Sequence, residues 1–229
     1  MKIGVPKEIK TAESRVAITP AGVEAFVKNG NEVYIEKDAG IGSGIANEEY
    51  VKAGAKILST AKEVYDVADM IMKVKEPQPS EYDYLKEGQV LFTYLHLAPD
   101  KQQTEALLKK KVIGIAYETV QLDNGALPLL TPMSEVAGRM SVTIGAYLLT
   151  NLNEGRGIVM GGVPGVEPAE VVIIGGGTVG TNAAKVAVGM GARVTILDVN
   201  LDGLIELQLL IFGGKSYNIG CKSCKTCIS

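Results

Sequence analysis

The feature that most constrains the fold is a group of three spaced glycines between an apolar stretch and a helical one. Gly175, Gly177 and Gly180 follow the apolar residues 171–174 in the spacing G-x-G-x-x-G, and residues 179–190 can form a helix. In such a strand–turn–helix unit the first glycine permits a tight turn. The second lets the backbone approach a pyrophosphate, and the third lets the helix pack closely on the strand. The helix amino terminus adds unpaired N–H donors for the phosphates, so the spacing predicts a dinucleotide-binding turn.

An acidic residue follows this turn at the spacing that such a site requires. The apolar residues 193–197 predict a second strand, which ends at Asp198, about 20 residues beyond the glycines. A carboxylate here accepts hydrogen bonds from the adenosine ribose and repels a 2′-phosphate, so Asp198 favours NAD over NADP. Thr178 and Val179 lie where loop N–H groups would meet the phosphates. The alternatives are a solvated strand end for Asp198 and simple turn geometry for Thr178 and Val179.

Strands and helices alternate along most of the chain, which is typical of βαβ units around a parallel sheet. A helix is indicated at Pro20, where Thr19 is the cap and Gly30 the stop. A second helix is capped by Asp100, and a third, long helix is expected from Ser134 to about residue 149. The apolar runs that predict strands are 3–5, 31–36, 70–74, 89–94, 112–116, 171–174 and 193–197.

The alternation predicts an α/β fold of two Rossmann-like, doubly wound domains with parallel sheets, the second of them incomplete. We expect an N-terminal catalytic, substrate-binding domain at 1–130 and a linking helix at 131–153. A partial NAD-binding Rossmann domain at 154–212 and an irregular tail at 213–229 would follow.

Three polar side chains near predicted strand ends form a candidate small-acid site. His96, the only histidine, follows an apolar strand, and Lys75 lies at the end of another. Open α/β sheets bind ligands at the carboxyl ends of their strands, and a histidine there can exchange a proton near neutral pH. Arg15 can bind a carboxylate bidentately. Each residue also has an ordinary interpretation, a hydrogen-bonded loop histidine or a solvated surface charge, and spacing alone does not show that the three converge.

Composition excludes several classes of protein. The net charge is -3 with no basic stripe, so nucleic acid is not an expected partner. The amino terminus lacks the apolar core of a signal peptide, and no apolar run approaches the length of a membrane span, so we expect a cytoplasmic protein. Three cysteines crowd into the tail as Cys221, Cys224 and Cys227. Zinc and iron–sulfur sites normally need a fourth ligand, so we expect no metal there.

Several longer motifs resemble one family. They are MKIGVPKEIK at 1–10, ESRVAITP at 13–20, KVKEP at 73–77, LFTYLHLA at 91–98, PMSEVAG at 132–138 and GGVPG at 161–165. In this order, over residues 1 to about 200, the chain resembles alanine dehydrogenase and the related N-terminal part of transhydrogenase alpha subunits. The uninterrupted Tyr-Leu-His-Leu-Ala at 94–98 favours alanine dehydrogenase.

The resemblance implies roles for matching residues. Arg15 and Lys75 would bind the carboxylate and carbonyl side of pyruvate or alanine, and His96 would donate and accept protons. Ser134 would contact the cofactor phosphates, and Asp198 the adenosine, with Thr178 and Val179 completing the contacts. The alternative interpretation of Ser134 is an ordinary N-cap serine. The implied reaction is the reversible, NAD-dependent oxidative deamination of L-alanine to pyruvate and ammonia, carried out by a hexamer.

The resemblance weakens near residue 201, and chains of the family continue well past residue 229. We therefore expect a second domain without its remaining strands and without the family's further catalytic aspartate. Exposed apolar strands should make NAD binding weak and turnover absent or very low. Two alternatives stay open, a transhydrogenase-type nucleotide-binding module and a non-catalytic remnant.

Overall fold

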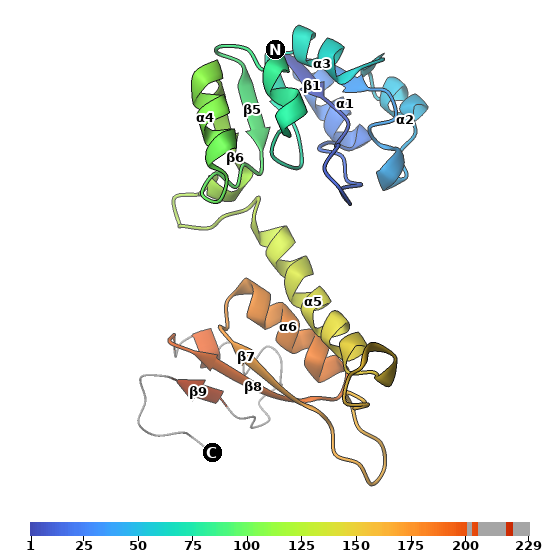
Figure 1. Ribbon diagram of the computed structural model, residues 1–229, viewed down its shortest axis with the longest axis vertical. Coiled ribbons are helices and arrows are strands. Elements are labelled where there is room, and N and C mark those ends of the chain that lie inside the picture. The colour runs from blue at the N-terminus through green and yellow to red at the C-terminus, as the bar shows by residue number, and fades with distance from the viewer. Residues whose placement is uncertain (201–202, 206–218, 222–229) are drawn as a thin grey trace. The chain divides into compact units, whose positions relative to one another are not determined.

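The computed structural model describes residues 1–200, 203–205 and 219–221. The chain divides into two compact units, Met1–Leu127 and Pro128–Ser229 (Figure 1). Among the described residues, no helix combines the length and apolar character that crossing a bilayer demands.

Unit 1 is built around a six-stranded parallel sheet. Its strands are β1 (Lys2–Val5), β2 (Glu32–Glu36), β3 (Lys56–Leu58), β4 (Met70–Met72), β5 (Val90–Thr93) and β6 (Ile113–Ala116). The strand order is β3-β2-β1-β4-β5-β6, and each adjacent pair is parallel. This is the order of a doubly wound nucleotide-binding fold, as the sequence predicts for the first domain.

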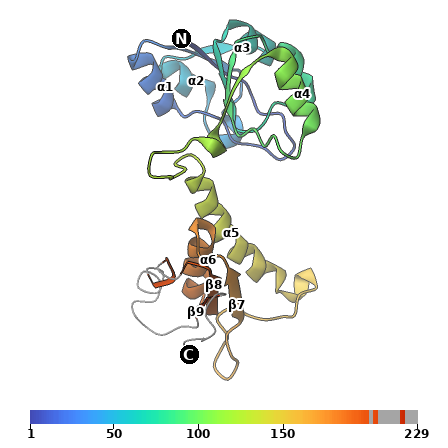
Figure 2. The same cartoon turned by 90° about the vertical axis from the view of Figure 1, so that its left-hand side faces the viewer.

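Helices connect these strands and cover both faces of the sheet. They are α1 (Pro20–Lys28), α2 (Asn47–Lys52), α3 (Ala61–Val67) and α4 (Lys101–Lys110), with 3-10 turns η1 (Ile41–Ser43), η2 (Pro79–Tyr84) and η3 (Tyr117–Thr119). Figure 2 shows α1 and α2 on one side of the sheet and α4 on the other. The predicted caps are present, because Thr19 accepts from the Gly22 amide and Asp100 from the Gln103 amide. These contacts satisfy N–H groups that the first turn leaves unpaired.

The core of unit 1 has two parts, which follow from the alternation of side chains along a strand. Val33 and Ile35 of β2 pack with Val23 of α1 and Tyr50 of α2 in one cluster. The other cluster joins β4 and β5 to α3 and α4 through Val64, Tyr65, Ile71, Leu91 and Leu107. Burial on both faces explains why these strands appear in the sequence as short, nearly continuous apolar runs.

In its described residues, unit 2 holds a three-stranded parallel sheet and two long helices packed together. Its elements are α5 (Thr131–Leu148), η4 (Asn151–Asn153), β7 (Glu170–Ile174), α6 (Thr178–Gly189), β8 (Arg193–Asp198) and β9 (Ile219–Cys221), and residues 203–205 are helical. The strand order is β7-β8-β9, so within the described chain β7 lies at an edge. Its side chain Ile174 is 83% exposed.

Two features of unit 2 differ from the sequence predictions. The long helix begins at Thr131, where the predicted helix 131–153 also begins, but Ser134 is not its N-cap, a position that Leu130 occupies without a side-chain contact. The helix packs along α6 inside unit 2, through Gly138 and Val142. The tail predicted to be irregular, 213–229, contains β9, which pairs in parallel with β8. Its other residues lie outside those that the structure describes.

Candidate functional site

The strand order of unit 1 defines where a ligand would bind. The order of the strands reverses direction between β1 and β4. In sheets of this kind, ligands bind in a crevice at such a reversal, outside the carboxyl ends of the strands. Three of the predicted residues follow strands at this edge. Arg15 lies in the segment after β1, Lys75 lies after β4, and His96 lies after β5.

The Arg15 guanidinium is oriented by a neighbouring carboxylate. Its Nε donates to Glu13 Oε1 at 2.8 Å and one terminal nitrogen donates to Glu13 Oε2 at 2.6 Å. This bidentate contact lowers the pKa of Glu13 to about 2, mainly through the hydrogen bonds from Arg15, with a smaller contribution from the charge of Lys75. The charges of Arg15 and Lys75 therefore both act on the Glu13 carboxylate.

The backbone of Lys75 is held on both sides by side chains from other segments. Glu8 Oε1 accepts from the amides of Val74 at 2.6 Å and Lys75 at 3.2 Å. The Thr93 hydroxyl donates to the Lys75 carbonyl at 2.9 Å. The Lys75 side chain is 19% exposed, and its ammonium lies 3.7 Å from Glu76 Oε2. Lys75 is thus fixed at its backbone and keeps a charge close to the strand ends.

A buried ionic network underlies this lysine. Lys73 Nζ lies 3.2 Å from Glu8 Oε2 and 3.0 Å from Glu81 Oε1, and the Tyr65 hydroxyl donates to Glu81 Oε1 at 3.1 Å. All four side chains are buried. Burial raises the pKa of Glu8, and the charge of Lys73 opposes that shift. Its signal in the sequence is Lys73 inside the otherwise apolar run 70–74, since a charge buried in a strand needs a partner.

His96 lies on an exposed turn and has an unusual backbone conformation. Its φ is +46°, in the left-handed region that few non-glycine residues adopt. The imidazole is stacked near the Tyr94 ring, with 6.3 Å between centroids and 22° between planes. Tyr94 in turn contacts Tyr117 edge-on at 5.0 Å. The imidazole therefore lies beside an aromatic group, Tyr94 and Tyr117, that no sequence motif indicates.

Tyr94 connects the histidine to the arginine. Burial raises the pKa of Tyr94, the positive charge of Arg15 opposes this shift, and the negative charge of Glu118 adds to it. Tyr94 therefore lies within electrostatic range of Arg15 while its ring stacks near His96. Its amide also donates to the carbonyl of Val74, next to Lys75, at 3.4 Å. Lys75 and His96 thus follow the ends of two adjacent strands, β4 and β5, and the charge of Arg15 acts on Tyr94 beside them.

In unit 2, the glycine turn has the geometry that the spacing predicts. Gly175 has a φ of +101°, which favours glycine. A Cβ at Gly180 would lie 1.8 Å from the carbonyl oxygen of Gly175, so the helix approaches the strand as closely as a glycine allows. Gly177 is the N-cap of α6 and makes no side-chain cap, and a Cβ there would meet no atom within 4 Å. The backbone at Gly177 is therefore open to a ligand.

Asp198 lies against the same turn. Its carboxylate accepts from the amides of Gly176 and Asn200, the latter at 2.8 Å. These backbone hydrogen bonds, with that of Asn200 the largest, lower the pKa of Asp198. Asp198 also lines two small cavities beside the turn. The side chain is therefore anionic at neutral pH and lies against the glycine turn.

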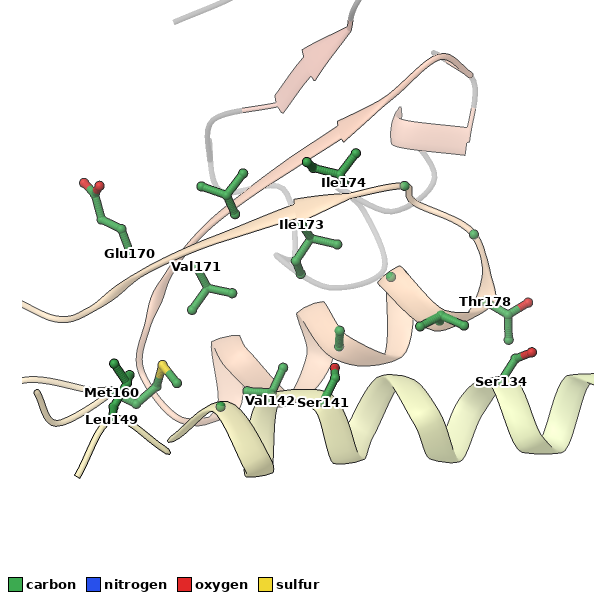
Figure 3. A pocket seen from close by; sticks show the side chains of 17 residues that line it. Ser134, Ser141, Val142, Leu149, Met160, Glu170, Val171, Ile173, Ile174 and Thr178 are labelled. Atoms are coloured by element: carbon green, nitrogen blue, oxygen red, sulfur yellow. The ribbon is translucent and has the colours of Figure 1, made fainter. Parts of the chain in front are cut away.

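A cavity of about 800 Å³ joins the remaining predicted cofactor residues (Figure 3). Its apolar part lies between β7 and the two helices, and Val171 and Ile173 point into it from the strand. At its polar end Ser134 of α5 lies beside Thr178 at the start of α6. The cavity lining includes all the predicted cofactor residues except Asp198: Ser134, Gly175, Gly177, Thr178, Val179 and Gly180.

Comparison with known proteins agrees with the motifs. A family model of the alanine dehydrogenase/PNT N-terminal domain matches residues 4–137, and one of the C-terminal domain matches residues 141–222. An alanine dehydrogenase of Methanococcus maripaludis is 69% identical over 94% of this chain and 57% of its own length. One of Geobacillus stearothermophilus is 59% identical over 91% of this chain and 56% of its own. The chain spans a little over half the length of these curated relatives.

Solved structures give the same result. An L-alanine dehydrogenase superposes with a TM-score of 0.90 at 51% identity, covering 97% of this chain and 61% of that protein. A transhydrogenase from Sinorhizobium meliloti shares the fold with a TM-score of 0.78 at 24% identity, covering 98% of this chain and 62% of that protein. The resemblance of the motifs is confirmed, and the chain belongs to the alanine dehydrogenase/PNT family.

Proposed function

We propose that this chain carries the substrate-binding and nucleotide-binding parts of an NAD-dependent alanine dehydrogenase. The reaction is the reversible oxidative deamination of L-alanine to pyruvate and ammonia. The observation that carries the proposal is that Lys75 and His96 follow the ends of β4 and β5, while the charge of Arg15 acts on Tyr94 beside them. Two cations beside an imidazole suit a substrate that has a carboxylate and a group that exchanges protons.

The residues of the glycine turn fit a dinucleotide. The open position at Gly177 leaves room for a pyrophosphate near the uncapped amino terminus of α6, whose partial positive charge favours anions. Ser134 and Thr178 add hydroxyl groups at the same end of the cavity. The anionic Asp198 supports NAD over NADP, since a 2′-phosphate would be repelled.

The chain's own residues would divide the chemistry as follows. When bound, NAD supplies the acceptor for the hydride that leaves the alanine Cα. Arg15, oriented by Glu13, binds the substrate carboxylate, and Lys75 interacts with the oxygen of the product carbonyl. An imidazole nitrogen of His96 takes the proton that the ammonium group must lose before its lone pair can form the C=N bond. After releasing this proton to solvent, the same nitrogen takes a proton from the water that attacks the C=N bond and returns it to the amino group. As ammonia leaves, the hydroxyl proton of the intermediate passes to the imidazole and the carbonyl of pyruvate forms.

Oligomeric state and location belong to the proposal as well. We propose a homo-oligomer, a hexamer by family resemblance, and the support is an exposed apolar face of α5. Val136, Met140, Ile144 and Tyr147 on this helix are 46–61% exposed. Apolar surface of this kind favours association. Sedimentation velocity of the purified chain measures the state. The cytoplasmic location stays a prediction, which cell fractionation would test.

An absorbance assay tests the proposed activity. NADH formation from L-alanine, and its consumption with pyruvate and ammonium, should depend on His96. Hydride exchange between two nucleotides without amino-acid turnover would indicate the transhydrogenase alternative instead. If NAD titration shows no binding and the absorbance assay shows no turnover, the proposal is refuted and the non-catalytic alternative remains.

A further inference from the structure

The turn that carries His96 is held by a carboxylate from the next strand connection. The amide of His96 donates to Glu118 Oε1 at 2.8 Å, and the amide of Leu95 donates to the same oxygen at 3.1 Å and to Oε2 at 3.3 Å. Glu118 belongs to η3, directly after β6. One partly buried carboxylate therefore accepts both N–H groups that precede the imidazole.

The opposite side of this turn is held by α4. The fully buried Gln103 donates from Nε2 to the Leu95 carbonyl at 2.8 Å, and Thr104 donates to the Leu97 carbonyl at 3.3 Å. Hence the peptide between Leu95 and His96 has its carbonyl fixed from one side and its amide from the other. A left-handed residue other than glycine persists only where its surroundings determine it in this way.

The segment that bears Glu118 also supports the aromatic neighbour of the histidine. Tyr117 packs edge-on against Tyr94 at 5.0 Å and against Phe92 at 4.3 Å. The ring that stacks near the imidazole and the amide that fixes its backbone are therefore both held by η3. A shift of η3 would move the imidazole relative to Arg15 and Lys75.

The geometry points to Glu118 as the positioning residue for His96: its carboxylate holds the left-handed turn that aims the imidazole at the substrate. This inference rests on the proposed function for what the imidazole acts upon. The clamp itself is a property of the fold, and it can be measured without turnover.

Because His96 is the only histidine, labelling with ¹⁵N,¹³C-histidine on a deuterated background gives one amide signal for the full chain. A positive φ brings the amide proton of a residue close to the Hα of the same residue and gives a strong NOE between them. The labelled histidine therefore keeps its protons, while the rest of the chain is deuterated. We expect this NOE in the wild type and a weaker NOE with a broadened or doubled signal in Glu118→Ala. Glu118→Gln, which keeps one oxygen acceptor for both amides, should restore most of the NOE. Glu105→Ala, at an exposed position on α4, is the matched control and should match the wild type.

Pyruvate titrated against the same signal links the clamp to the site. We expect Glu118→Ala to bind pyruvate about tenfold more weakly, and Glu118→Gln to fall between it and the wild type. The far-UV circular dichroism spectrum of each variant should match that of the wild type, which would show that the variant folds. An unchanged NOE and unchanged pyruvate affinity in Glu118→Ala would overturn the inference, as would a Glu118→Gln variant that behaves like the alanine variant. If pyruvate fails to bind even to the wild type, the proposed function fails, while the NOE still decides whether Glu118 holds the turn.

Discussion

Replacing Gly180 with alanine should destabilise unit 2, because no room exists for even one methyl group. The new Cβ would lie 1.8 Å from the Gly175 carbonyl oxygen and 3.2 Å from Ile173 Cγ2. Side-chain carbons essentially never approach closer than 3.0 Å, so the turn or the helix must move by more than an ångström. The nearest obstacle is backbone, and it cannot rotate away as a flexible side chain could.

The size of the effect follows from this forced movement. Overpacking of a core contact costs about 1–3 kcal/mol of the free energy of unfolding. For a domain of about 100 residues, each kcal/mol lowers the melting temperature by roughly 4–8 °C. Differential scanning calorimetry should therefore show the transition of unit 2 falling by roughly 5–20 °C. The transition of unit 1 should stay where it is. NAD affinity should fall as well, because the displaced turn presents the phosphate-binding amides.

Gly177→Ala is the matched control for this substitution. Gly177 has a φ of -67°, and a Cβ there meets nothing within 4 Å, so stability should be unchanged. The methyl group would point into the open space where a pyrophosphate is proposed to pass, so NAD should bind about tenfold more weakly by calorimetric titration. A Gly180→Ala variant as stable as the wild type would refute the close-packing argument. Wild-type NAD affinity in Gly177→Ala would refute the proposed path of the cofactor.

Three further predictions follow from the two sites. His96→Ala should lower any NADH formation from L-alanine at least about a hundredfold in the absorbance assay, with NAD affinity unchanged. Arg15→Ala should return the pKa of Glu13 from about 2 toward 4.5, measured by carboxyl NMR. Because that pKa is depressed in the folded chain, the ion pair stabilises the fold above pH 4.5 and this contribution is lost as the pH falls toward 2. Asp198→Asn should raise the affinity for NADP relative to NAD by about tenfold, measured by fluorescence titration, since the repelling charge is removed.

Much of the fold could be predicted from local patterns, and the misses have local causes. The glycine spacing and the caps Thr19 and Asp100 act within a few residues, so sequence alone locates them. The prediction overlooked β3, α2 and α3, which have only three to seven residues each. A signal for α3 was available, because Thr60 and Glu63 form a capping box in which each side chain accepts from the other's backbone amide.

The candidate site was only partly predictable, because its supporting contacts depend on strand pairing. The sequence indicates His96 by its place after an apolar strand. Glu118 lies 22 residues later, and nothing near it in the sequence links it to the histidine. Once β5 and β6 are paired in parallel with Thr93 opposite Ala116, the residues two positions beyond each are Leu95 and Glu118, side by side. Register, which sequence patterns do not fix, is thus the missing step.

The long helix α5 shows a different limit of the sequence pattern. Periodicity groups Val136, Met140, Ile144 and Tyr147 on one face, yet these side chains are exposed in the described chain. The face that packs on α6 carries Gly138, where a Cβ would lie 2.2 Å from the carbonyl oxygen of Val179. Two helices that pack closely need small residues at their contact, whereas a row of large apolar residues does not show which surface covers it. Hydrophobic periodicity therefore identified an exposed apolar face, whereas the contact inside unit 2 is made by small residues that the pattern does not mark.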